Sequence, residues 1–384
     1  MMYFNYAATS YKRPDCVIDA VIKAMSGSGN AGRGSSSVDL GSARTAYETR
    51  TELAKLFGFS YPERVVFSYN ATTSLNQAIL GLLNYGDHVI ATDWDHNSVI
   101  RPLNYASERG TLVDYIQANA NGKLRIEDLD GLIRSNTKLV ICTHASNVTG
   151  DVADIRKITA VAHDHGIPVL VDASQTAGAY PINMEKDGID ILVFTGHKSL
   201  MGPTGTGGMC VGSNIDIAAV IRGGTGIQSL NPLQPSEYPE HLEAGTINIH
   251  GIAGLYAAVR YIANIGAENI RQKELTLANR FIMGIRDIPG ITIYGSAGEL
   301  SSERTSVVSM NISGIGADEV GDILTNRFDI AVRTGIHCAP RMHRALGTDR
   351  TGTVRFSFGL FNTEYEIDAA IEAVREISEM AGNV

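Results

Sequence analysis

The chain has 384 residues, of which 44% are hydrophobic and 19% charged, as in ordinary globular proteins. Its formal net charge of -9, with no cluster of lysine and arginine, argues against a nucleic acid or an anionic membrane as a partner. No apolar run approaches the roughly 18 residues needed to span a bilayer, and the first residues lack the pattern of a signal peptide. Four widely spaced cysteines are typical of reduced thiols, so we expect a cytoplasmic protein.

Helices and short strands alternate over about the first 200 residues. The predicted helices lie at 14–25, 38–57, 71–83, 99–109, 126–133 and 154–165. Short apolar, β-branched runs lie between them at 64–68, 88–91, 112–114, 139–142, 168–172 and 189–194. Continuous apolar strands between helices are typical of a sheet buried on both faces. The pattern therefore predicts an α/β fold with a mainly parallel sheet.

The pattern changes after Val211, where a loop rich in glycine and proline begins. Helices are predicted at 251–264, 268–288, 317–328 and 364–380, with strands at 291–294, 306–312 and 354–358. We expect two domains, a large α/β domain over residues 14–250 and a smaller α+β domain over residues 251–384 joined by residues 1–13.

A glycine-rich loop follows the strand-like run at 189–194 and carries His197 and Lys198 side by side. A lysine at the end of a buried strand is poorly solvated, so its amine should lose a proton more easily than a surface amine. Schiff-base chemistry requires such an amine. Taken alone, however, this residue is better explained as an ordinary solvated lysine, since most lysines are surface groups.

The glycines of this loop also raise the alternative of a nucleotide site. Their spacing excludes it, because they follow Lys198 instead of preceding it, and no G-x-x-x-x-G-K-[ST] motif occurs. The turn also lacks the G-x-G-x-x-G spacing of a dinucleotide site.

Polar residues collect where the predicted strands end, and ligands bind at that edge of such a sheet. They are Thr72, Thr73, His96, Asn147, Asp172 and Gln175. Each has a simpler structural explanation, since Thr72 and Asp172 could cap helices and His96 could be an ordinary loop histidine. Their common position at one edge, together with Lys198, favours a ligand site.

The combination points to pyridoxal 5'-phosphate. A lysine for a Schiff base, a carboxylate for the pyridinium nitrogen and a helix start for the phosphate are the parts that this cofactor needs. Thr72 and Thr73 supply the helix start. Asp172 would keep the ring nitrogen protonated, so that the ring can accept electrons from the substrate Cα.

One cysteine differs from the others. Cys338 lies in a loop near Arg333, His337 and Arg341, and positive neighbours favour its thiolate form. We expect a reactive thiol there and no metal site, because only His337 and His343 stand near it at ligand spacing. The other three are expected to be packed small hydrophobic residues: Cys16, Cys142 and Cys210.

These motifs resemble those of the cysteine desulfurases of the class V aminotransferase group, which are fold-type I pyridoxal-phosphate enzymes. The likeness extends from residues 3–9 to residues 355–363, nearly the whole chain. It rests on the motifs DHNSVIRP, SNVTG, DASQ, TGHK, EAGT, RTGIHC and TVRFS. It implies a seven-stranded sheet in the large domain and a homodimer.

The resemblance also implies a role for each site residue. The residues implied at the cofactor are His96 stacked on its ring, Asn147 near it and the substrate, Asp172 on the ring nitrogen, Gln175 on the phenolic oxygen, Thr195 and His197 on the phosphate, Lys198 as the Schiff-base lysine, and Thr246 on the phosphate of the other subunit. Arg355 would hold the substrate carboxylate, with help from Arg333, and Cys338 would accept the sulfur.

The implied reaction removes sulfur from L-cysteine, giving L-alanine and a persulfide on Cys338 whose sulfur passes to an acceptor protein. His96 is a candidate for moving the thiol proton of the substrate. Three alternatives remain open: a selenocysteine lyase acting on L-selenocysteine, another class V aminotransferase or lyase that does not need Cys338, and a binding scaffold without catalysis.

The chain departs from the usual family pattern at several places. Asn5 and Tyr6 replace Asp-Asn, Asn70 and Ser74 stand where glycine and glutamate are common in the phosphate turn, and Ser36 and Ile336 replace histidines that are common in group II enzymes, the class with the short cysteine loop. None of these positions is the lysine, the aspartate or the cysteine of the expected site.

Overall fold

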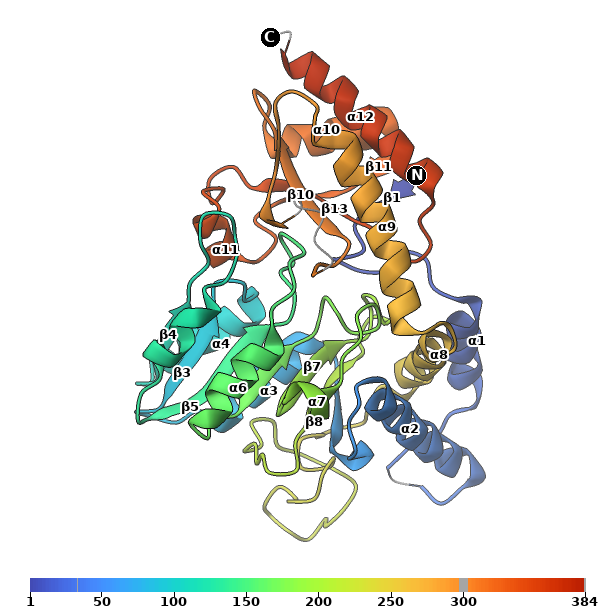
Figure 1. The fold of residues 1–384 in the computed structure, drawn as a ribbon. Coiled ribbons are helices and arrows are strands. Elements are labelled where there is room, and N and C mark those ends of the chain that lie inside the picture. The colour runs from blue at the N-terminus through green and yellow to red at the C-terminus, as the bar shows by residue number, and fades with distance from the viewer. Residues whose placement is uncertain (33, 297–302, 383–384) are drawn as a thin grey trace.

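The computed structural model describes residues 1–32, 34–296 and 303–382 (Figure 1). Its helices are α1 (Asp15–Gly27), α2 (Ser37–Leu56), α3 (Ala71–Leu82), α4 (Asn97–Ser107), α5 (Leu129–Leu132), α6 (Ile155–Asp164), α7 (Met184–Asp187), α8 (Ile249–Ile265), α9 (Ala267–Ile285), α10 (Ala317–Phe328), α11 (Pro340–Ala345) and α12 (Glu364–Gly382). Its strands are β1 (Met2–Tyr3), β2 (Val65–Ser68), β3 (His88–Thr92), β4 (Leu112–Ile116), β5 (Thr137–Thr143), β6 (Val169–Asp172), β7 (Ile191–Thr195), β8 (Gly207–Val211), β9 (Ile291–Ile293), β10 (Val307–Ile312), β11 (Ile330–Ala331), β12 (Arg333–Gly335) and β13 (Thr353–Ser357).

Seven strands form the larger sheet, in the order β2-β8-β7-β6-β5-β3-β4. Neighbouring strands are parallel except at β8, which runs antiparallel to both β2 and β7. The predicted α/β class with a mainly parallel seven-stranded sheet is therefore confirmed.

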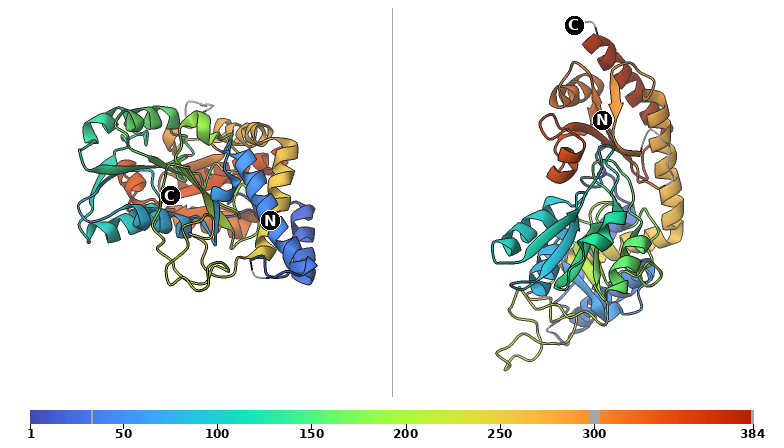
Figure 2. Two further views of the ribbon diagram at one scale, coloured as in Figure 1. Left: turned by 90° about the horizontal axis from the view of Figure 1, so that it is seen from below. Right: turned by 60° about the vertical axis from the view of Figure 1, so that its left-hand side comes forward.

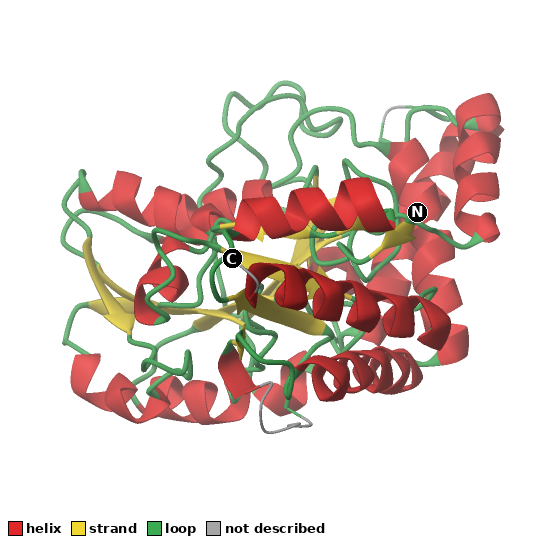
Figure 3. Ribbon diagram, turned by 90° about the horizontal axis from the view of Figure 1, so that it is seen from above, coloured by secondary structure: helices red, strands yellow, loops and turns green. Residues whose placement is uncertain are grey.

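Both faces of this sheet are buried under helices (Figure 3). Along β5, Val140 and Cys142 belong to a core that includes apolar residues of α2, α6 and α8. The intervening Leu139 and Ile141 belong to a second core with α3 and α4. Because successive side chains of a strand point to opposite faces, a strand covered on both sides must be apolar throughout, as the sequence pattern indicated.

A smaller antiparallel sheet, in the order β12-β13-β10-β9, lies apart from the larger one (Figures 1 and 2). It shares a core with Phe4 and with apolar residues of α9, α10 and α12. The first strand of the chain belongs to this region, because Met2 pairs with Ile330 in a parallel β1–β11 ladder. The division into two domains at residue 250 stays a prediction. It would fall near the start of α8, which begins at Ile249.

One strand of the larger sheet, β8, was not predicted from the sequence. β8 opens with Gly207 and Gly208, and glycine is disfavoured in strands. The structure requires it there, because a Cβ at Gly208 would lie 2.4 Å from the carbonyl oxygen of Val66. Close approach of neighbouring backbones thus explains a residue type that local propensity counts against a strand.

Residues 212–248, between β8 and α8, contain no helix or strand and project from the lower end of the molecule (Figures 1 and 2). This agrees with the predicted loop. Among the described helices, none combines the length and the apolar character needed to cross a membrane.

Candidate active site

The carboxyl ends of the parallel strands place the predicted residues around one cavity of about 220 Å³. β6 ends at Asp172 and β7 ends at Thr195, three positions before Lys198. Two arginines of the smaller sheet close the cavity from the other side. The predicted residues that line it are Thr72, His96, Asn147, Asp172, Gln175, Thr195, His197, Lys198, Arg333 and Arg355.

Lys198 is partly buried in the glycine-rich loop that follows β7. Burial lowers the pKa of its ammonium group to about 8, while the charge of Asp172 opposes this and favours the protonated form. The loop is held by the N-terminal segment, since the Ser10 N–H donates to the His197 carbonyl and the Ser10 hydroxyl donates to the Lys198 carbonyl. The loop that carries the lysine is therefore held in place, and a larger fraction of its amine is neutral at physiological pH than in a surface lysine.

His96 caps the helix that follows β3. The Ser98 N–H donates to His96 Nδ1 at 3.1 Å, as in a helix N-cap. Burial, and next the charge of Lys198, lower the pKa of His96 to about 4. The ring is thus neutral at pH 7.

Arg333 and Arg355 are register partners across β12 and β13, so both guanidinium groups enter the cavity from one side. Arg355 donates to the Asn147 carbonyl at 2.9 Å and to Asn5 Oδ1 at 3.2 Å, both of which are neutral acceptors. Burial, and next the charge of Arg333, lower the pKa of Arg355 to about 9. Asn5, one of the departures from the family pattern, therefore leaves the charge of Arg355 available to an anionic ligand.

Cys338 lies in a tight turn closed by the Ala339 N–H donating to the Ile336 carbonyl at 3.1 Å. The two central residues, His337 and Cys338, both adopt left-handed backbone conformations, with φ of 50° and 60°. This is the pattern of a type I′ turn, which normally requires Asn or Gly. The turn is anchored to the cavity, since the Asn147 amide donates to the His337 carbonyl at 2.7 Å.

Of the three positive neighbours expected for Cys338, one contacts the sulfur. Arg333 Nη2 lies 3.6 Å from Cys338 Sγ. Burial lowers the pKa of His337 to about 2, so its ring is neutral. Arg341 pairs with Asp93 at 2.8 Å and stacks on Tyr115. The expectation of three positive neighbours was therefore wrong for His337 and Arg341, because burial and an ion pair remove their charge from the thiol.

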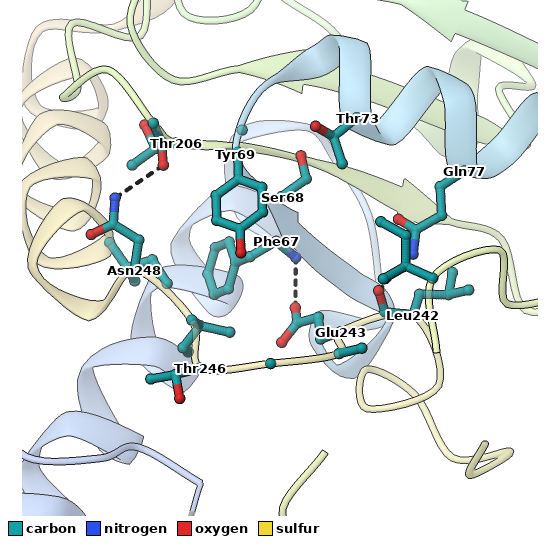
Figure 4. A pocket seen from close by; sticks show the side chains of 17 residues that line it. Phe67, Ser68, Tyr69, Thr73, Gln77, Thr206, Leu242, Glu243, Thr246 and Asn248 are labelled. Atoms are coloured by element: carbon teal, nitrogen blue, oxygen red, sulfur yellow. Dashed lines mark hydrogen bonds between the residues drawn. The ribbon is translucent and has the colours of Figure 1, made fainter. Parts of the chain in front are cut away.

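Thr73 and Thr246 do not line the cavity that contains Lys198. They line a second pocket, together with Tyr69 and Glu243 (Figure 4). The N–H and the hydroxyl of Thr73 both donate to Asn70 Oδ1, which caps α3. Consecutive residues of a helix start point in different directions, so only Thr72 of the pair faces the cavity.

A buried ion pair supports the wall of the second pocket. The Glu243 carboxylate accepts hydrogen bonds from both terminal nitrogens of Arg50 at 2.8 Å. It also accepts the Phe67 N–H of β2 at 2.6 Å (Figure 4). The side chains of Arg50 and Glu243 are both 8% exposed. The pair therefore joins α2, β2 and the segment that leads to Thr246.

We expect Arg50→Ala to destabilise the protein by about 3–5 kcal/mol, because it leaves the Glu243 carboxylate buried without its partner. Urea unfolding followed by fluorescence would measure the change. Lys55→Ala is the matched control on the same helix, since the Lys55–Glu52 pair is exposed at its lysine end and such pairs contribute at most about 1 kcal/mol. Equal effects of the two substitutions would contradict this assignment.

Several residues around the cavity were missed by the sequence analysis. Ser98 and Thr143 line it, as do Ala7 and Ala8 of the N-terminal segment. Ser98 could have been suspected, because it stands two positions after His96 at a helix start. The position of Ala7 and Ala8 depends on the pairing of β1 with a strand more than 300 residues away, which no local pattern reveals.

The model of the family named aminotransferase class-V matches residues 2–370. The chain belongs to the class-V aminotransferase family. It is 32% identical to a cysteine desulfurase of Haloferax volcanii over 99% of this chain and 90% of that one. It spans 56% of the length of a longer relative from Mycolicibacterium paratuberculosis, to which it is 33% identical over its own full length.

Solved structures of this family agree with the fold. The apo structure of a cysteine desulfurase from Thermococcus onnurineus superposes with a TM-score of 0.89 at 31% identity, over 98% of this chain and 94% of that one. The resemblance to the cysteine desulfurases among the class-V aminotransferases is thereby confirmed.

The cavity suits a polar, anionic cofactor. Within the described residues, Thr195 Oγ1, Asn147 Oδ1 and Arg355 Nε are buried and have no hydrogen-bond partner. Buried polar atoms are normally satisfied, so these three indicate contacts that a ligand would supply. A single carboxylate, Asp172, faces Lys198 and the two arginines, so the lining favours a ligand with more negative than positive charge.

Proposed function

We propose that this protein is a pyridoxal 5'-phosphate-dependent cysteine desulfurase. It would convert L-cysteine into L-alanine and leave the sulfur as a persulfide on Cys338. The observation that carries the proposal is the convergence of Lys198, Asp172 and two arginines on one cavity, with Arg333 also in contact with the Cys338 sulfur. An aminotransferase would have no need of that thiol.

The cofactor would be held by residues of the large sheet. Thr72, Thr195 and His197 would bind its phosphate, Asp172 its ring nitrogen and Gln175 its phenolic oxygen, with Asn147 near the ring. When bound, pyridoxal 5'-phosphate supplies an electron sink for the bonds at the substrate Cα. Lys198 would bond to it covalently and His96 would stack on it.

Arg355 would bind the substrate carboxylate by a bidentate pair, with Arg333 as a second cation. Lys198 would take the proton from Cα and return a proton to the product. The Cys338 thiolate would attack the substrate sulfur, forming the S–S bond as the C–S bond breaks. The balance is L-cysteine plus a protein thiol giving L-alanine plus a protein persulfide.

We also propose a homodimer, in which Thr246 would contact the phosphate bound by the other subunit. Two observations support this: Thr246 lies outside the cavity of its own chain, and Leu230 and Leu233 in the neighbouring loop are 100% and 75% exposed. The persulfide would pass to an acceptor protein.

The decisive experiment is incubation of the purified protein with L-cysteine, with alanine, sulfide and a persulfide on Cys338 as readouts. Side-by-side turnover of L-selenocysteine would test the alternative of a selenocysteine lyase. Alanine without a persulfide on Cys338 would contradict the role of that residue. Transamination without release of sulfur would instead indicate another class-V activity.

We expect the rate of pyridoxal 5'-phosphate capture by the cofactor-free protein to rise with pH and to level off above about pH 8. The neutral amine is the reactive form, and burial lowers the pKa of Lys198 to about 8. At pH 7 about one tenth of the amine would be neutral, against a few parts in ten thousand for a surface lysine. Stopped-flow absorbance at several pH values would measure this.

Asp172→Asn should shift that curve to lower pH, because the charge of Asp172 favours the protonated form of Lys198. A midpoint near pH 10 in the original protein, or a shift to higher pH in the variant, would contradict this account.

A further inference from the structure

A chain of hydrogen bonds joins the start of α3 to the ring of His96. Thr72 Oγ1 and Ser98 Oγ lie 2.7 Å apart, and Ser98 Oγ lies 2.9 Å from His96 Nδ1. All three residues line the Lys198 cavity. Ser98 is 9% exposed, so its hydroxyl has little access to solvent.

The direction of these hydrogen bonds follows from the backbone. The Ser98 N–H can only donate, and it donates to His96 Nδ1 at 3.1 Å. Nδ1 must then be unprotonated, so the Ser98 hydroxyl also donates to it. With its proton used in this way, Ser98 Oγ accepts from the Thr72 hydroxyl.

A neutral imidazole carries one proton, and here Nδ1 cannot hold it. The proton must be on Nε2. We propose that Ser98 is a positioning residue, whose hydroxyl and N–H together hold His96 in the Nε2–H form, so that His96 offers a hydrogen-bond donor to the ligand and cannot act as a base through Nε2.

This narrows the role of His96 in the reaction. A base for the substrate thiol would need an unprotonated nitrogen facing the ligand, whereas the arrangement leaves the unprotonated nitrogen on the α4 side, bound by Ser98. The catalytic part of the inference rests on the proposed function, but the tautomer of His96 does not.

The tautomer can be observed directly in the full-length, cofactor-loaded protein labelled with ¹⁵N-histidine. Long-range ¹H–¹⁵N correlation spectra distinguish protonated from unprotonated ring nitrogens, and His96→Gln identifies the resonances of His96 by their loss. We expect an unprotonated Nδ1 and a protonated Nε2 in the original protein. A protonated Nδ1 would overturn the proposal.

Ser98→Ala removes the hydroxyl and leaves only the longer backbone contact. We expect a mixture of the two tautomers and a loss of roughly fivefold in kcat for L-cysteine, with KM unchanged within about twofold. The pH profile of ring protonation, followed in the same spectra, should move to higher pH, because the ring loses a donor that disfavours protonation. The other charged groups that face the ring, Lys198, Asp172, Arg333 and Arg355, are unchanged by this substitution.

Two further variants separate this role from a merely structural one. Ser98→Thr keeps the hydroxyl and should restore the single tautomer and the original pH profile. Ser74→Ala, a buried serine on α3 that bonds to Ser68, should leave the His96 resonances unchanged. If Ser98→Ala keeps the original tautomer and profile, Ser98 has no such role. If the original protein fails to act on cysteine, the proposed function fails while the spectra still decide the tautomer.

Discussion

Lys198→Ala is expected to abolish the covalent attachment of pyridoxal 5'-phosphate and to lower cysteine turnover by at least about 1,000-fold. The substitution removes both the amine that would bond to the cofactor and the group that would move the Cα proton. The absorbance of the cofactor bonded to the protein should disappear after gel filtration. Alanine formation from L-cysteine gives the rate.

Lys138→Ala is the matched control, because Lys138 is an exposed lysine on β5 of the same sheet. It should keep both the absorbance and the rate. If Lys198→Ala retains the protein-bound absorbance, another amine holds the cofactor and the assignment of the lysine is wrong.

Cys338→Ala is expected to keep the cofactor absorbance while lowering alanine formation from L-cysteine by at least about 100-fold. The sulfur contacts Arg333 but does not line the cavity, so its removal should leave the cofactor contacts intact. Mass spectrometry after brief exposure to L-cysteine should find an added sulfur on the original protein and none on the variant.

Cys16→Ala is the control substitution, and it should change neither the cofactor absorbance nor the rate of alanine formation. Cys16 is an exposed free thiol on α1, and it should accept no sulfur during turnover. A variant lacking Cys338 that still makes alanine at the original rate would show that Cys338 is not the nucleophile. Added sulfur on Cys16 in the original protein would point to non-specific persulfidation.

The fold was accessible from the sequence because the main signals are local. Helices and strands lie within about three residues of their predicted ends in most cases, since apolar runs and helix starts depend on neighbouring residues. The elements that were not predicted are short helices, α7 and α11, and strands whose existence depends on distant partners. β1 and β12 are two and three residues long and carry no pattern of their own.

The cavity was predictable to the extent that strand ends define it. Asp172 and Lys198 follow directly from parallel strands that end at one edge, whereas Thr195 was implied only by the family resemblance. The direction in which each side chain points could not be predicted from the sequence. Thr72 and Thr73 are adjacent in sequence, yet they line different pockets, because consecutive residues at the start of α3 point in different directions.

The charges around Cys338 could not be predicted from the sequence either. Closeness in sequence to His337 and Arg341 suggested a positive environment, but a buried histidine is neutral and a paired arginine is already compensated. Sequence reports which groups are near, whereas burial and partners decide their charge. Arg333 retains its role because its side chain contacts the sulfur itself.

The attachment of the first residues to β13 has a consequence for how the protein is made. Asn5 bonds to Arg355, and the Ala7 N–H donates to the Ser357 hydroxyl at 2.9 Å. During synthesis the N-terminal segment must wait roughly 20–70 seconds for these partners, at the usual pace of about 5–20 residues per second. The larger sheet can form while the chain is still growing, but the wall opposite Lys198 cannot. A complete cavity exists only once translation has passed β13, so the proposed cofactor would meet its full set of contacts only after that point.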